Sequence, residues 1–196
     1  MVVAFDEMGS SGDSCRPGYE VLKRWLESTP PDLLTTRRAE AELLFRRIGI
    51  TFNVYGDEAG EERLIPFDII PRILTKKEWS VLARGLEQRV KALNAFLADI
   101  YSKGEILRAG LVPDDLIYRN PYYRPEMAGL KLAHDIYVMI AGIDIVRVDP
   151  DTFYVLEDTA RTPSGVSYML ENREVMMRLF PDLFAEQRIA PVENYP

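Results

Sequence analysis

The sequence predicts an α+β fold in which helices pack on antiparallel β-ribbons. Two observations carry this prediction. The segment from Thr75 to Ile100 repeats apolar residues at steps of three and four, which is typical of an amphipathic helix. The segment from Asp135 to Asp158 contains short runs rich in β-branched and other apolar residues on both sides of the turn residues Asp149–Thr152, which favours a hairpin of antiparallel strands.

The composition is that of an ordinary globular protein, with 47% hydrophobic and 28% charged residues. We expect a Gly- and Ser-rich, flexible N-terminal arm over residues 1–18 and a single α+β domain over residues 19–196. The net charge of −7 argues against non-specific nucleic-acid binding, because that needs a basic surface. Cys15 is the only cysteine, which excludes an intramolecular disulfide and a cysteine-based metal site.

The expected location is the cytoplasm, and no membrane is expected as a partner. Residues 1–14 lack the basic and apolar regions of a signal peptide, and no apolar segment is long enough to span a bilayer. The sequence does not indicate an oligomeric state.

Four helices are expected from capping and stop signals. The first covers Tyr19 to Ser28 before two prolines, and the second begins with a cap at Thr35 or Thr36 and stops at Gly49. The third follows a capping box at Thr75. The fourth starts near Val166 and ends at about Leu179, because Pro181 cannot continue it.

The third helix carries an apolar stripe that we expect to face the core. Its members are Trp79, Leu82, Leu86, Leu93, Leu97 and Ile100. Strands are expected over Ile50–Tyr55, with a turn at Gly56-Asp57, over Arg63–Ile73 as an edge or bulged strand, and over Ile136–Ile140. Residues 104–130 contain many Gly and Pro residues and are expected to be mostly loop with one short helix.

The last hairpin brings two carboxylates into opposition. A four-residue loop from Asp149 to Thr152 would pair Val148 with Phe153, and the same ladder would pair Asp144 with Glu157. Directly opposed residues have Cβ atoms about 4.5–5.5 Å apart on one face, where like charges are destabilising. A divalent cation such as Mg²⁺ or Mn²⁺ would relieve the repulsion, since it takes oxygen ligands and completes its shell with water and phosphates.

Three other interpretations of this pair remain open. One carboxylate could be protonated, or a basic residue (Arg147, Arg161 or Lys131) could neutralise both in a structural cluster. A register slip of one residue would instead place the two acids on opposite faces.

The loop after Glu157 has the residue types of an anion site. It supplies the guanidinium of Arg161, the hydroxyls of Ser164 and Ser167, Gly165, and the start of a helix. Backbone N–H groups at a helix start attract anions, and arginine binds phosphate or carboxylate with two parallel hydrogen bonds. An ordinary capped helix start is the alternative interpretation.

At these residues the sequence resembles a known family. Gly142-Ile143-Asp144, Glu157-Asp158-Thr159 and Pro163-Ser164-Gly165 resemble the metal-binding ribbon of ATP-grasp enzymes. The resemblance narrows to the uncharacterised, circularly permuted ATP-grasp proteins through further segments along nearly the whole chain. These are Phe5–Met8, Gly49–Phe52 with Val54–Gly56, Pro66–Arg72, Glu78-Trp79, Gln88-Arg89, Ala92–Asn94 with Phe96-Leu97, and Ser164–Arg173.

The resemblance implies a partial, circularly permuted ATP-grasp fold that uses ATP and Mg²⁺ (or Mn²⁺). In such a site Asp144, Glu157 and Thr159 would hold metal, and Arg161 would contact phosphate or an acyl phosphate. Ser164, Gly165 and Ser167 would lie at the nucleotide. Thr159 departs from the pattern, which has asparagine there. Members of this group are also much longer, so we expect the remaining nucleotide pocket to lie outside residues 1–196.

The implied activity is an ATP-dependent ligase that joins a carboxylate to an amine through an acyl phosphate. Its partners would be a nucleotide and small-molecule or peptide carboxylate and amine substrates, and residues 1–196 alone are expected to turn over no ATP. A non-catalytic interaction module that retains the fold is the alternative, motivated by Thr159. A metal-dependent phosphoester hydrolase would need more carboxylate or histidine ligands, and His134 is the only histidine.

Overall fold

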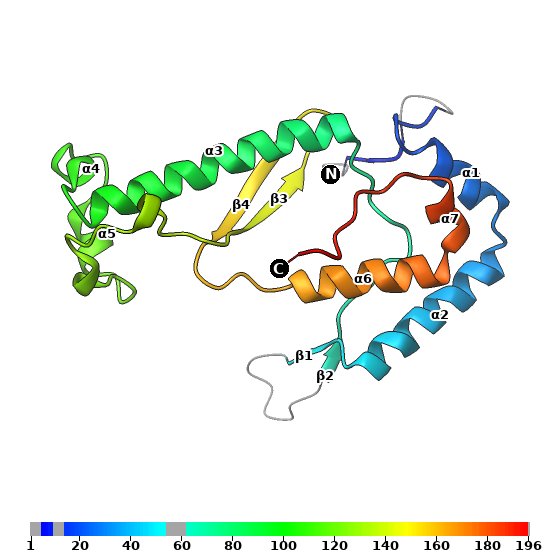
Figure 1. The fold of residues 1–196 in the computed structure, drawn as a ribbon. Helices are drawn as coiled ribbons and strands as arrows, with labels where there is room; N and C mark the ends of the chain where they lie inside the picture. The colour runs from blue at the N-terminus through cyan, green and yellow to red at the C-terminus, as the bar shows by residue number, and fades with distance from the viewer. Residues whose placement is uncertain (1–4, 10–13, 54–61, 196) are drawn as a thin grey trace, which may run out of the picture. The chain divides into compact units, whose positions relative to one another are not determined.

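The computed structural model describes residues 5–9, 14–53 and 62–195, and the chain forms two compact units (Figure 1). The first unit comprises Met1–Thr75 with Ser164–Pro196, and the second comprises Lys76–Pro163. Helices predominate in both, and each unit contains one small antiparallel sheet of two strands. The predicted α+β class is therefore confirmed.

The first unit is built around four helices. They are α1 (Glu20–Ser28), α2 (Pro31–Ile48), α6 (Val166–Leu179) and α7 (Pro181–Ala185). Although they are far apart in the sequence, α2 and α6 contact each other and lie side by side in Figure 1. Their apolar sides form a buried core with Tyr19, Leu22, Ala41, Phe45, Ile50, Ile69, Val175, Met176, Leu179, Phe180 and Leu183.

Most helix ends of this unit agree with the sequence prediction. Gly49 ends α2 in the left-handed conformation, with φ of 78°, and α6 has the predicted bounds. The predicted start of α2 at Thr35 or Thr36 is wrong, because α2 begins at Pro31. Proline suits the first helical position, where its missing N–H would have no intrahelical acceptor. The two threonine hydroxyls instead donate to carbonyl oxygens four residues earlier.

The sheet of the first unit is short. Strands β1 (Thr51–Asn53) and β2 (Glu62–Leu64) pair antiparallel, with Thr51 opposite Leu64. The end of the predicted first strand and the Gly56-Asp57 turn lie outside the described residues. The second strand was predicted to reach Ile73 but ends at Leu64. Pro66 follows closely, and proline cannot donate a ladder hydrogen bond.

The second unit is organised along the 25-residue helix α3 (Lys76–Ile100). It also contains α4 (Glu105–Arg108), α5 (Asp114–Tyr118), the 3₁₀ turns η1 (Pro125–Met127) and η2 (Ala133–Asp135), and strands β3 (Gly142–Arg147) and β4 (Phe153–Thr159). Leu82 and Ile100 are the buried residues of α3. Trp79 was predicted to face the core but is 53% exposed.

The predicted strand over Ile136–Ile140 is also absent. His134 and Asp135 have left-handed φ angles of 57° and 54°, which breaks an extended course just before this segment. The amide Oδ1 of Asn94 on α3 accepts the backbone N–H groups of Tyr137 and Val138, at 2.7 and 2.8 Å. A helix side chain therefore satisfies donors that a partner strand would otherwise satisfy.

Candidate functional site

The β3–β4 ribbon places Asp144 directly opposite Glu157, as the sequence predicted. Both side chains are exposed. Thr159 lies two residues after Glu157 on the same face, and its hydroxyl donates to Glu157 Oε1 at 3.4 Å. The three oxygen-bearing side chains predicted as metal ligands therefore share one face at the open end of the ribbon.

The register near the turn differs from the prediction. Arg147, not Val148, pairs with Phe153, and Ile145 pairs with Val155. The ladder then shifts by one residue between Asp144 and Ile145, so Leu156 is an extra residue in β4. Such a β-bulge turns the following residues to the other face of the strand. The predicted Asp144–Glu157 pair is correct because the longer turn and the bulge offset each other.

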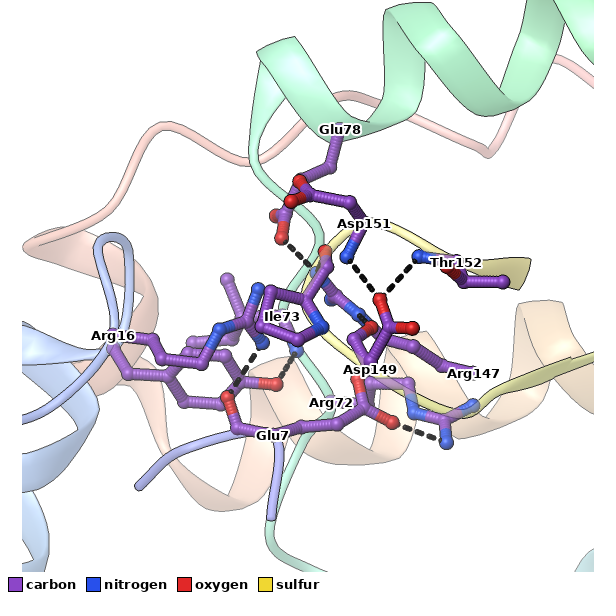
Figure 2. A network of polar contacts seen from close by, with 11 residues as sticks. Glu7, Arg16, Arg72, Ile73, Glu78, Arg147, Asp149, Asp151 and Thr152 are labelled. Atoms are coloured by element: carbon purple, nitrogen blue, oxygen red, sulfur yellow. Dashed lines mark hydrogen bonds and ion pairs between the residues drawn. The ribbon is translucent and has the colours of Figure 1, made fainter. Parts of the chain in front are cut away.

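The basic residues that could have neutralised the pair have other partners or none. Arg147 Nη2 lies 2.5 Å from Glu78 Oε1 on α3, and it also donates to the carbonyl oxygen of Pro150 (Figure 2). The guanidinium of Arg161 lies over the ring of Tyr122, 4.9 Å from its centroid. Within the described part of the chain, Lys131 forms no ion pair, and the side chain of Asp144 forms neither an ion pair nor a hydrogen bond. A structural cluster around the two acids is therefore not observed.

These donors suit a small, hard cation. Mg²⁺ is commonly held by one or two carboxylates, with water and substrate phosphate in the other positions. Asp144 and Glu157 supply two such carboxylates without a compensating cation, and Thr159 supplies a neutral oxygen. Among the described residues no group of three or more His, Cys, Asp or Glu side chains is placed to hold a metal. The site thus suits a cation that keeps much of its shell for water and phosphate.

The other predicted contacts fall into both units. Arg161 belongs to the second unit and is exposed. Ser164, Gly165 and Ser167 belong to the first unit, at the start of α6, where Gly165 has a φ of 91°. The Gly165 carbonyl accepts the N–H of Met169 in the first turn of that helix. A joint site of these residues with the ribbon stays a prediction.

An ion pair beside the candidate ligands was not predicted from sequence. Arg89 on α3 holds Asp158 with two parallel contacts, Nε to Oδ1 at 2.7 Å and Nη2 to Oδ2 at 2.6 Å. Hydrogen bonds from Arg89 lower the pKa of the Asp158 carboxyl, and the same bonds raise the pKa of Arg89. No sequence signal identifies the pair, because 69 residues separate its members and each looks like an ordinary surface charge.

A second ion pair occupies the turn end of the ribbon. The Arg147 side chain is 1% exposed and its partner Glu78 is 18% exposed. Asp149 Oδ1 accepts the N–H groups of Asp151 and Thr152, both at 2.8 Å (Figure 2). Backbone hydrogen bonding, mainly from Asp151, lowers the pKa of Asp149. These contacts close the turn and give it a structural role.

Two further observations concern residues away from the ribbon. Arg72, the last residue of the family-like segment Pro66–Arg72, forms an ion pair with Glu7, with Nη2 and Oε1 2.5 Å apart (Figure 2). No helix in the described ranges is both long enough and apolar enough to cross a bilayer.

Comparison with known proteins identifies a family. Residues 71–196, more than half of the chain, match the family described as "A circularly permuted ATPgrasp". An uncharacterized protein of Synechocystis is 41% identical over 98% of this chain and 40% of its own length. An uncharacterized protein of Mycobacterium leprae is 41% identical over 98% of this chain and 34% of its own length.

A third relative carries a functional name. The Frankia alni protein "Putative glutamate--cysteine ligase 2-3" is 40% identical over 91% of this chain but only 20% of its own length. The chain therefore spans well under half the length of the curated relatives it matches. The extent of the family match and the ribbon geometry lead to one conclusion: this chain belongs to the circularly permuted ATP-grasp family.

Proposed function

We propose that this chain supplies the metal-binding half of an ATP-dependent carboxylate–amine ligase. Asp144, Glu157 and Thr159 would hold Mg²⁺, or Mn²⁺, on ATP. The observation that carries the proposal is the opposed pair of exposed carboxylates with no compensating basic side chain in the described residues. Family membership supports ATP and Mg²⁺ as the cofactors, since ATP-grasp proteins generally use them.

The proposed reaction transfers the terminal phosphate of ATP to a carboxylate, and an amine then displaces that phosphate to form an amide. Phosphoryl transfer requires mainly positioning and charge neutralisation, so no side-chain nucleophile is needed. The bound cation would neutralise the phosphate charge. The Frankia relative, named for the joining of glutamate to cysteine, supports the ligase class, but the match covers only 20% of that protein.

The residues of this chain would have separate tasks. Asp144 and Glu157 would bind the cation from opposite strands, and Thr159, whose hydroxyl lies 3.4 Å from Glu157 Oε1, would add a neutral oxygen ligand on the same face. Arg161, which is exposed after β4, would bind phosphate oxygens with its guanidinium. Ser164, Gly165 and Ser167 would contribute hydroxyl and backbone N–H donors at the start of α6. The proposal also includes a small-molecule or peptide carboxylate and an amine as substrates, and the cytoplasm as the location.

The proposal is tested by Mn²⁺ titration of the chain, with and without ATP, followed by electron paramagnetic resonance. The double variant Asp144→Asn with Glu157→Gln should lose about tenfold or more in Mn²⁺ affinity, because both charged ligands become neutral. The matched control is Asp151→Asn with Glu126→Gln, which removes the same charge from two other exposed acids. Equal affinities for the two double variants would refute the metal site.

A further inference from the structure

The bulge at Leu156 decides which face of the ribbon carries Glu157. Arg147 contacts Glu78 of α3 and Asp158 contacts Arg89 of α3, so residues 147 and 158 lie on the helix-facing side. Figure 1 shows the ribbon running beside α3. Without the bulge, the ladder that starts at Arg147 and Phe153 would place Leu156 opposite Asp144. Glu157 would then face α3, and Asp158 would face outward.

Because Glu157 and Asp158 are consecutive, the register of β4 decides which of the two acids lies on the outward face. Either register brings a carboxylate to the outward face, Glu157 in one case and Asp158 in the other. In the observed register Asp158 pairs with Ile143, and both oxygens of its carboxylate bind Arg89. Arg89 thus engages the acid that would otherwise compete with Glu157 for the outward position.

We propose that Arg89 is a positioning residue for the candidate metal site. Its bidentate ion pair with Asp158 holds β4 in the bulged register that brings Glu157 and Thr159 beside Asp144. This inference rests on the proposed function, because it assumes that these three residues bind a cation. It assigns Asp158 a supporting role outside the ligand set.

Because the Arg89–Asp158 ion pair is exposed, its loss should change the metal affinity more than the stability of the fold. The Arg89 side chain is 45% exposed, so solvent screens the ion pair and its contribution to overall stability is small. Residues that orient metal ligands have a larger effect on binding, typically about 10–100-fold in metal affinity. Loss of Arg89 should therefore weaken cation binding while the chain stays folded.

The experiment compares Arg89→Ala with Arg84→Ala. Arg84 lies on the same helix and is exposed, and its side chain has no ion pair or hydrogen bond among the described residues. We expect Arg89→Ala to lower Mn²⁺ affinity about tenfold and Arg84→Ala to leave it within about twofold, the scatter expected for a surface change away from the site. The charge-swapped variant Arg89→Glu with Asp158→Arg should recover most of the lost affinity.

A second readout follows the register without any metal. In the wild-type chain, nuclear Overhauser effects should connect Asp144 with Glu157, and in Arg89→Ala new ones should connect Asp144 with Leu156. Unchanged register together with an affinity equal to that of Arg84→Ala would overturn the inference and leave the proposed function standing. Absence of Mn²⁺ binding by the wild-type chain would overturn the proposed function, and the register measurement would then decide the role of Arg89 alone.

Discussion

The two ends of the β3–β4 ribbon differ in how their charged side chains are compensated by the described residues. At the turn end, the buried guanidinium of Arg147 contacts Glu78 and the carbonyl oxygens of Asp149 and Pro150. At the open end, the carboxyl side chains of Asp144 and Glu157 are both exposed. Within the described ranges, the two carboxyl side chains take part in one hydrogen bond, which the Thr159 hydroxyl donates to Glu157 Oε1 at 3.4 Å.

This contrast separates charges that the chain itself compensates from charges for which the described residues offer no basic partner. The chain itself compensates the turn end, where burial makes an unbalanced charge costly. In the described ranges it leaves the open end uncompensated, although opposed like charges cost about 0.2–1 kcal/mol in a ribbon. The proposed cation would remove that cost. Substitutions at the two ends should therefore change stability in opposite directions.

The largest effect is expected at the turn end. Arg147→Met keeps an apolar side chain of similar length but removes the guanidinium from Glu78 and the turn carbonyls. Breaking a buried ion pair typically costs 3–5 kcal/mol, and the partial exposure of Glu78 argues for the lower value, about 3 kcal/mol. Chemical denaturation measures the loss.

The control for this variant is Arg119→Met. Arg119 pairs with Asp115 on the surface, with both side chains at least 69% exposed, so its loss should cost less than about 0.5 kcal/mol. Equal losses for the two variants would mean that the turn end does not depend on its buried ion pair.

At the open end, a substitution is expected to raise the free energy of unfolding instead of lowering it. Asp144→Asn removes one of two opposed like charges, so it should stabilise the chain by about 0.2–1 kcal/mol when divalent cations are absent. Addition of Mg²⁺ should reverse the order, because the cation would then stabilise the wild-type chain by binding to it. Thermal unfolding with a chelator and with Mg²⁺ tests both halves. Destabilisation in the chelator would contradict the idea that the pair is uncompensated.

The smallest effect is expected from the charge of Asp149 and depends on pH. The lowered pKa of Asp149 means that the folded state stabilises the ionised carboxylate more than the unfolded state does. The resulting stability is present above the unfolded pKa of about 3.9 and is lost as pH falls through the lower folded pKa. The stability gap between wild type and Asp149→Asn should therefore shrink on acidification. A gap that stays constant below about pH 4 would contradict this assignment.

Local chemistry made several elements predictable from sequence. The bounds of α6 follow from Gly165 and from the proline after its end, and the stop of α2 follows from Gly49. The exposure of Trp79 was not predictable from the apolar period, since periodicity identifies a face of a helix and not how far a partner covers it. The irregular course near His134 likewise depends on a side chain far along the sequence, that of Asn94.

The candidate site also has features that local sequence predicted and features that it did not. Short apolar runs and the turn residues between them predicted a hairpin with Asp144 opposite Glu157, and the structure has that pair. The prediction assumed a ladder of paired residues without interruption, however, and no residue near Leu156 indicates a bulge in the sequence. The pairing was right because two deviations of one residue cancelled. The grouping of the ribbon with Arg161 and the residues of α6 at one site stays a prediction.

The sequence by itself determined the α+β class, most helix ends and the identity of the two opposed acids, because these depend on short-range preferences and on a family pattern. Only the tertiary structure decided how the charges of the ribbon are compensated. Arg147 meets Glu78, and Arg89 meets Asp158, each across 69 residues of chain. Such contacts arise when α3 lies along the ribbon, and they leave the carboxylates of Asp144 and Glu157 without a basic partner among the described residues.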